Sequence, residues 1–226
     1  MKPSFTLSLS FFLLSFAFAS CNDDDATPEP TPFVLTDHYV AGTLTPKSNT
    51  YSSVYLISFL QNNKAVFIGS GNNLTGDYRL TKDSLIVEIS DPNNYRIARF
   101  GINENHELTS AYYRALTMEY GATGTLVPIA ATNQLAGKTF KGEEMKMGPT
   151  SFRKDLLYRF NVAGTSYGSG VDPATINPDA NSFELINNST FKYKQGSTTE
   201  LGFVVDQKLT VFRQSGLFYF GTYTQQ

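Results

Sequence analysis

Beyond residue 33, hydrophobic and polar positions alternate or gather into short apolar runs, and no long segment has the spacing of an amphipathic surface helix. Segments rich in β-branched and aromatic residues recur about every 8–12 residues between turn-forming residues, which is typical of an all-β barrel or sandwich. We expect antiparallel strands near residues 38–45, 53–60, 64–69, 75–81, 84–90, 95–102, 107–113, 117–127, 138–145, 155–163, 182–187, 190–195, 200–206, 208–214 and 217–224.

The alternation within two of these strands predicts which side chains face the interior, because successive residues of a strand point to opposite faces. The inward-facing side chains are expected to be Leu156, Tyr158, Phe160, Val162, Phe191 and Tyr193. Asparagine pairs between strands mark turns, since asparagine tolerates positive φ. These pairs lie at 62–63, 72–73, 93–94 and 187–188, and glycine-rich turns are expected at 69–71 and 168–170.

The strands divide into two sets that resemble one unit used twice. Gly42-Thr43-Leu44 lies 82 residues before Gly124-Thr125-Leu126, and Gly137-Lys138-Thr139 lies 84 residues before Gly221-Thr222-Tyr223. A hairpin at 78–84 corresponds to one at 183–189, and 107–109 corresponds to 208–210. We therefore predict β domains at 37–130 and 135–226, joined by a polar linker; chance similarity between β-meanders is the alternative.

The N-terminal segment has the pattern of a secretory signal at residues 1–20. Lys2 precedes an uncharged, mostly apolar stretch from Phe5 to Ala19, which is too short to span a bilayer as a helix. Cys21, the only cysteine of the chain, follows directly. Residues 21–36 form an acidic and proline-rich tether, which should be extended. An ordinary signal peptide that happens to end at a cysteine is the alternative interpretation.

Small residues before Cys21 resemble the lipobox of bacterial lipoproteins, which implies lipidation of Cys21 and a membrane anchor. The acidic run Asp23–Asp25 resembles the export signal of lipoproteins in the Bacteroidetes, which implies the outer membrane and its surface-exposed face; a solvated spacer is the alternative. The glycines of the opening and closing strands make each half similar to the lipocalin-like domains of such lipoproteins. Each half would hold seven or eight antiparallel strands, and an eight-stranded barrel is either filled by its own side chains or holds one small ligand.

The net charge and the absence of known catalytic motifs argue against several classes of function. With 18 Lys and Arg against 20 Asp and Glu, the formal net charge is −2, so no basic field is available for nucleic acid. The two histidines, His38 and His106, have no metal-ligand spacing, and the cysteine serves the anchor. No nucleophile elbow occurs. We expect no enzyme activity, no cofactor and no metal site.

Aromatic residues are the remaining candidates for function. Most should pack in the core, and the others should line a pocket or a partner surface. The candidate ligand-binding residues are Tyr158, Phe160, Phe191 and Tyr193, with further aromatic residues at Tyr51, Tyr55, Tyr112 and Tyr113. The leading hypothesis is a lipid-anchored binding module for a small apolar or amphipathic ligand. The alternative is an accessory subunit that docks onto an outer-membrane protein.

Overall fold

The computed structural model describes residues 32–47, 51–147 and 150–226, and Val34–Gln226 forms one compact unit. The predicted signal peptide, Cys21 and residues 21–31 of the predicted tether lie outside the described residues. A single 3₁₀ turn, η1 (Leu35–Asp37), precedes the first strand, and the side chain of Leu35 is buried. Within the described ranges, no helix is long and apolar enough to span a membrane.

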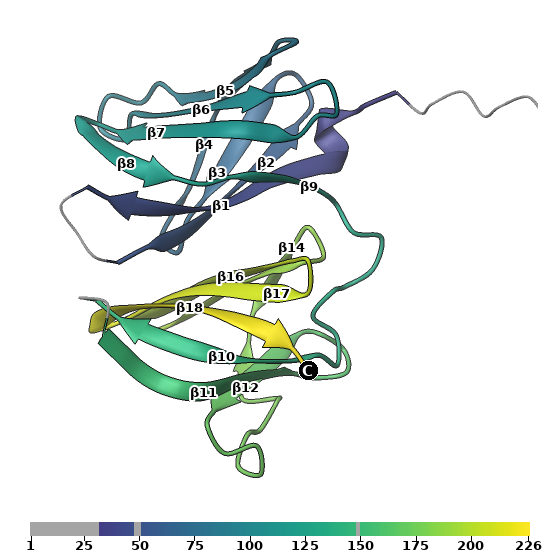
Figure 1. Cartoon of the computed structure of the whole chain (residues 1–226), viewed down its shortest axis with the longest axis vertical. Coiled ribbons are helices and arrows are strands. Elements are labelled where there is room, and N and C mark those ends of the chain that lie inside the picture. Colours follow the sequence, from purple (N-terminus) through teal and green to yellow (C-terminus); the bar gives the residue numbers. More distant parts are fainter. Residues whose placement is uncertain (1–31, 48–50, 148–149) are drawn as a thin grey trace, which may run out of the picture. The chain divides into compact units, whose positions relative to one another are not determined.

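The first sheet closes on itself (Figure 1). Its strands are β1 (His38–Pro46), β2 (Ser53–Leu60), β3 (Lys64–Ile68), β4 (Asn73–Leu80), β5 (Ser84–Ile89), β6 (Arg96–Ile102), β7 (Leu108–Ala115), β8 (Met118–Ala122) and β9 (Thr125–Pro128). Each strand pairs antiparallel with its neighbour, and β1 pairs with both β2 and β8, which completes an eight-stranded ring. Strand β9 continues the course of β8 along β1.

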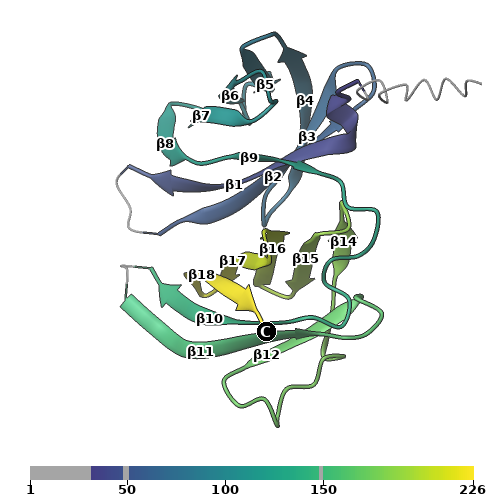
Figure 2. The same ribbon diagram turned by 45° about the vertical axis from the view of Figure 1, so that its right-hand side comes forward.

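The second sheet is a nearly closed barrel of the same kind. Its strands are β10 (Thr139–Lys146), β11 (Thr150–Phe160), β12 (Ser166–Gly170), β13 (Asn181–Ser182), β14 (Glu184–Ile186), β15 (Thr190–Gln195), β16 (Thr198–Val205), β17 (Lys208–Ser215) and β18 (Leu217–Gln225). In the turned view of Figure 2, β10–β12 form one wall of this barrel and β14–β18 the other. The predicted all-β fold with two tandem antiparallel barrels is confirmed.

Strand pairing also shows which positions of the two barrels are equivalent. A Cβ atom added at Gly42 would lie 2.0 Å from the carbonyl oxygen of Thr123, and one added at Gly142 would lie 2.2 Å from that of Thr222. Both glycines therefore let the closing strand approach the opening strand. The opening strands align through Gly42 and Gly142, and not through Gly42 and Gly137 as the sequence repeat suggests.

The structure departs from the sequence-based expectations at several places, and the strand expected at 182–187 is divided between β13 and β14. Residues 166–170, expected to include a turn, form strand β12, where Gly168 leaves room for the carbonyl of Asn177. Val162 was expected to face inward, but its side chain is 89% exposed because β11 ends at Phe160. The strand expected at 117–127 is interrupted between β8 and β9.

Apolar side chains form two kinds of core. Alternate residues fill the barrel interiors, as Leu156, Tyr158 and Phe160 do in the second barrel. Residues of the opposite strand faces form a second layer that the two sheets share. This shared layer consists of the buried residues Tyr39, Ala41, Val54, Leu56, Ile68, Leu201, Phe203 and Phe212. Strands such as β2 therefore bury both faces, which explains their nearly continuous hydrophobic sequence.

Candidate functional site at the mouth of the first barrel

A pocket of about 250 Å³ lies at the end of the first barrel where β1 ends and β2 begins. Its lining residues are Leu44, Ser53, Val54, Tyr55, Phe67, Gly69, Ser70, Gly71, Asn72, Leu74, Arg96, Tyr113, Ala115 and Tyr120. They come from seven strands, β1–β4 and β6–β8, and from the loop between β3 and β4. Because the ring of strands converges on this point, the pocket is the mouth of the barrel.

Stacked aromatic rings form the floor of this mouth. The ring centroids of Tyr55 and Phe67 are 5.4 Å apart, and those of Phe67 and Tyr113 are also 5.4 Å apart. Tyr120 meets Tyr113 edge to face at 5.4 Å. Tyr55 is held in place because its hydroxyl donates a hydrogen bond to the carbonyl of Thr123, with an O–O distance of 2.7 Å. The floor is thus a preformed layer of packed rings, in which Tyr55, Phe67 and Tyr113 are 1%, 7% and 3% exposed.

Among the described residues, Arg96 is the only charged one that lines the mouth. One of its terminal nitrogens donates to the carbonyl of Asn94 at 2.8 Å, and its positive charge acts on the Tyr113 hydroxyl. Burial raises the pKa of Tyr113 to about 12, although the charge of Arg96 partly opposes that rise. No carboxylate of the described residues is within ion-pair distance of Arg96, so this cation has no counter-ion among them.

The wall of the mouth on one side is the loop Gly69–Asn72. Added Cβ atoms at Gly69 and Gly71 would have no neighbour within 4 Å, so this loop packs loosely. The ammonium of Lys192, on β15, donates to the carbonyl of Gly71 and to the side-chain oxygen of Asn73, each at 2.7 Å. The second barrel therefore holds the loop that walls the first barrel's mouth.

The corresponding end of the second barrel has different residues at the same places. The strand registers align Leu44, Ser53, Ala98, Tyr113 and Tyr120 of the first barrel with Glu144, Arg153, Glu200, Arg213 and Tyr219 of the second. Four neutral residues have thus been replaced by two acids and two arginines, while the tyrosine is retained. The second barrel carries a charged cluster where the first has a mouth.

Ion pairs fill that end of the second barrel. Arg213 donates to both carboxylate oxygens of Glu144, at 3.0 and 2.9 Å, and Arg153 donates to Glu144 at 2.8 Å. The side chain of Glu144 is only 1% exposed. Arg213 also lies over the ring of Tyr219, with 3.9 Å between its central carbon and the ring centroid. A bidentate pair with these extra contacts is geometrically well fixed, and it places charged side chains where the first barrel has its mouth.

Glu200 is the fourth charged residue of this cluster, 3.9 Å from Arg213, and its side chain is buried away from water. Burial raises its pKa to about 7, while hydrogen bonds from Tyr167 and Tyr158 and the charge of Arg213 act in the opposite direction. The Tyr158 hydroxyl lies 3.2 Å from a carboxylate oxygen of Glu200. Such a carboxyl group changes its charge near neutral pH, but it faces a filled interior and not a pocket.

The four candidate ligand-binding residues lie in the packed core of the second barrel. Tyr158, Phe160, Phe191 and Tyr193 are 0%, 2%, 0% and 8% exposed. Their rings contact one another, with centroid distances of 6.2 Å for Tyr158–Phe191 and 5.5 Å for Phe160–Phe191. The structure brings them together as mutual packing partners, and a ligand-binding role for them stays a prediction.

Sequence reasoning found part of the first barrel's mouth. Tyr55 and Tyr113 were among the noted aromatic residues, and both lie in its floor. Phe67 and Arg96 were missed. Phe67 has the same apolar pattern as any core residue, and Arg96 begins a strand as an ordinary polar residue. Their convergence depends on the closure of the barrel, which no local pattern reports.

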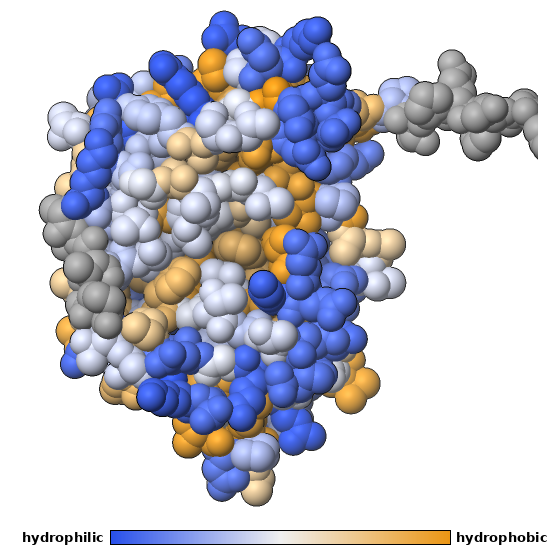
Figure 3. Space-filling model, in the orientation of Figure 1, coloured by the Kyte–Doolittle hydropathy of each residue, from blue (hydrophilic) through white to orange (hydrophobic). Residues whose placement is uncertain are grey.

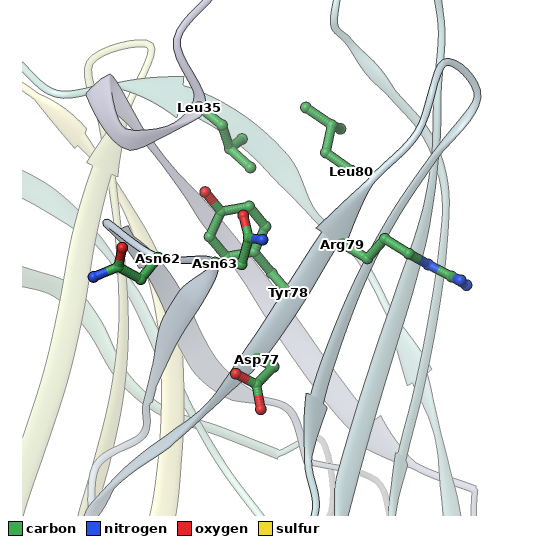
Figure 4. A pocket seen from close by; sticks show the side chains of 7 residues that line it. All are labelled: Leu35, Asn62, Asn63, Asp77, Tyr78, Arg79 and Leu80. Carbon is green, nitrogen blue, oxygen red and sulfur yellow. The ribbon is translucent and has the colours of Figure 1, made fainter.

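A larger pocket of about 620 Å³ lies at the opposite end of the first barrel (Figure 4). Its walls are largely solvent-exposed, and Arg79 points away from the ring of Tyr78. Asp77 pairs with Lys64 on the surface. Although Leu35, Tyr78 and Leu80 contribute apolar surface, most residues that line this hollow are exposed to solvent, so we regard it as a surface depression.

Metal chemistry has no geometric basis in the part of the chain that the structure describes. No group of three His, Cys, Asp or Glu side chains there could hold an ion. His38 lies beside the carbonyl of Val34, with 2.9 Å between its Nδ1 atom and that oxygen, and His106 occupies a turn with φ of 60°. The oxygen-rich loop 172–181 satisfies its own backbone, since Asp172 accepts from the amide of Ala174.

Comparison with protein-family models, with curated proteins and with solved structures finds no match to this chain.

Proposed function

We propose that this protein is a non-catalytic binding module that takes a small apolar or amphipathic ligand into the mouth of its first barrel. The observation that carries the proposal is the contrast between the two barrel ends. Equivalent positions hold an ion-paired cluster in the second barrel and leave a pocket of about 250 Å³ in the first. The second barrel places charged side chains at this end, whereas the first barrel has a pocket at the equivalent positions.

The physical properties of the mouth agree with a binding role. An eight-stranded barrel has room either for its own side chains or for one small ligand. Binding sites are typically concave and apolar, with a few polar groups that fix the orientation of the ligand. Here the stacked rings of Tyr55, Phe67 and Tyr113 supply the apolar floor, and Arg96 supplies the polar group. The volume, slightly below the roughly 300 Å³ of drug-sized sites, favours a compact ligand such as a single ring.

We further propose that the module is anchored in the outer membrane through a lipid on Cys21. The support is the sequence alone: an apolar segment, small residues before the cysteine, and an acidic, proline-rich stretch after it. Two acyl chains hold a protein at a membrane almost permanently, because each buried methylene contributes about 0.8 kcal/mol. Cys21→Ala is expected to lose membrane fractionation, and a processed variant that remains fully membrane-bound would contradict the anchor.

Phenol is a suitable first probe for the mouth because it combines a ring with a neutral polar group. We expect saturable binding of phenol to the full chain in calorimetry. Ala115→Trp should abolish this binding, since Ala115 lines the mouth and a large side chain there would fill it. Glu119→Trp is the matched control, because Glu119 is exposed and does not line the mouth.

Two outcomes would contradict the proposed function. One is the absence of saturable phenol binding by the unmodified chain. The other is phenol binding that survives Ala115→Trp unchanged in a variant that still unfolds cooperatively. Loss of binding in both tryptophan variants would point to a general loss of structure, which thermal melting of each variant detects.

A further inference from the structure

The charge balance of the first barrel's mouth is unusual for a closed protein interior. Of the described residues that line it, only Arg96 is charged, and none is a carboxylate. Its side chain is half-buried at the start of β6. A cation removed from water is ordinarily paired, because desolvation without a counter-ion costs several kcal/mol by rough estimate. Here none of the residues that the structure describes supplies a counter-ion.

The second barrel shows what such a counter-ion does in this fold. There the carboxylate of Glu144 lies inside the barrel end and receives hydrogen bonds from Arg213 and Arg153 at 2.8–3.0 Å. Glu144 is aligned with Leu44, which lines the first barrel's mouth. The first barrel thus has a guanidinium at its end but lacks the carboxylate that fills the second.

From this comparison we infer that the ligand of the first barrel is a compact amphipathic carboxylic acid whose carboxylate binds Arg96 and whose apolar part rests on the aromatic floor. This inference rests on the proposed function and adds the chemical class of the ligand. The ligand carboxylate would play at the first mouth the part that the Glu144 carboxylate plays in the second barrel.

The hydrogen-bonding capacity of Arg96 agrees with this assignment. A guanidinium has five N–H donors, and the one that binds the Asn94 carbonyl leaves others for a ligand. Arg96 lines the mouth together with Tyr113, whose pKa burial raises and the charge of Arg96 partly lowers, so a carboxylate on Arg96 would place its attached group beside the rings. Arginine binds carboxylates well because its planar donors match the two oxygens.

The loop that walls the mouth adds a second cation. The ammonium of Lys192 is fixed on the loop by its bonds to Gly71 and Asn73, and no carboxylate of the described residues is within ion-pair distance of it. Both cations favour an anion at this end of the barrel. Because the Lys192 ammonium is already hydrogen-bonded to the loop, we expect it to attract an anionic ligand electrostatically and not to contact it directly.

Benzoate and benzamide provide the test, because they share size and shape and differ in charge. Calorimetric titration of the full chain should show benzoate binding at least tenfold more tightly than benzamide. Arg96→Gln should bring the two affinities within about twofold of each other while benzamide still binds. Arg99→Gln is the matched control, since Arg99 lies on the same strand but is exposed and does not line the mouth.

Each other outcome has a definite meaning. Equal binding of benzoate and benzamide by the unmodified chain would overturn the inference while the proposed function stands, provided that Ala115→Trp blocks both. Loss of both probes in Arg96→Gln would also overturn it, because Arg96 would then only maintain the shape of the mouth. If benzoate, benzamide and phenol all fail to bind, the proposed function itself fails.

Discussion

Glu200 lies inside the second barrel, 5% exposed, between the Tyr158 hydroxyl and the guanidinium of Arg213. Desolvation raises its pKa to about 7, against a value of 4.5 for an ordinary glutamate. The folded protein therefore holds a proton that the unfolded chain has released between these two pH values. Stability contributed by this group is present below about pH 4.5 and declines as the pH rises to about 7.

Glu200→Gln should remove this pH dependence, since glutamine retains the shape and cannot ionise. The variant should be more stable than the unmodified protein at pH 8, by an amount on the order of 3 kcal/mol, and similar to it below pH 4.5. Urea unfolding at several pH values measures the difference. Glu143→Gln, on the exposed face of β10, is the control. A stability difference that does not change between pH 4.5 and 8 would contradict the assignment.

Single residues also show how far the site could be predicted from sequence. Tyr55 and Tyr113 could be noted as aromatic residues with a polar tip, but nothing in their neighbourhood distinguishes a mouth from a core. Tyr158 and Phe191 have the same local pattern and are packed against each other. The difference depends on which residues stand across the barrel: Leu44 and Ser53 leave space, whereas Glu144 and Arg153 fill it.

At the level of strands, the hydrophobic pattern was sufficient for most elements. The segments expected at 53–60 and 190–195 match β2 and β15 at both ends. The asparagine pairs at 62–63 and 187–188 do adopt positive φ. Strand β12 was missed because Ser166–Gly170 has small residues that resemble a turn, and only the loop packed against Gly168 explains them.

The close approach of the closing strand to β1 leads to a prediction about stability. An added Cβ at Gly42 would clash with the carbonyl of Thr123 on the closing side of the barrel. Gly42→Ala should therefore destabilise the protein by about 1–3 kcal/mol, as overpacked core substitutions do. Gly69→Ala is the control, with no neighbour near its added Cβ, and should change stability by less than about 0.5 kcal/mol. Equal stability of the two variants in urea unfolding would show that the closing strand can move away.

Over the whole compact unit, the two sheets share no strand pairing, yet they share an apolar layer. Leu56 of β2 and Leu201 of β16, both fully buried, belong to this layer. Polar contacts accompany it, since the Tyr39 and Ser189 hydroxyls form a hydrogen bond and Asn187 donates to Ser58. The space-filling view shows a mixture of hydrophilic and hydrophobic residues on the visible face of the molecule (Figure 3).

A fragment of residues 135–226 tests whether the second barrel folds alone and whether the shared apolar layer drives association. It should fold with one cooperative thermal transition, because its own sheet is nearly closed, but it should self-associate through the uncovered apolar layer. Leu201→Thr combined with Phe212→Thr should convert it to a monomer in gel filtration. A fragment that is unfolded with or without these substitutions would show that the second barrel requires the first to fold.

One barrel end is open to a ligand, whereas its counterpart carries ion-paired side chains. The most direct measurement is an NMR experiment on the full chain that detects intermolecular nuclear Overhauser effects between phenol protons and the protein. The account predicts contacts to the rings of Phe67, Tyr113 and Tyr120 and to the loop Gly69–Asn72, with none to Tyr219 or Arg213. Contacts to the second barrel's charged end, with the first mouth unaffected, would contradict it.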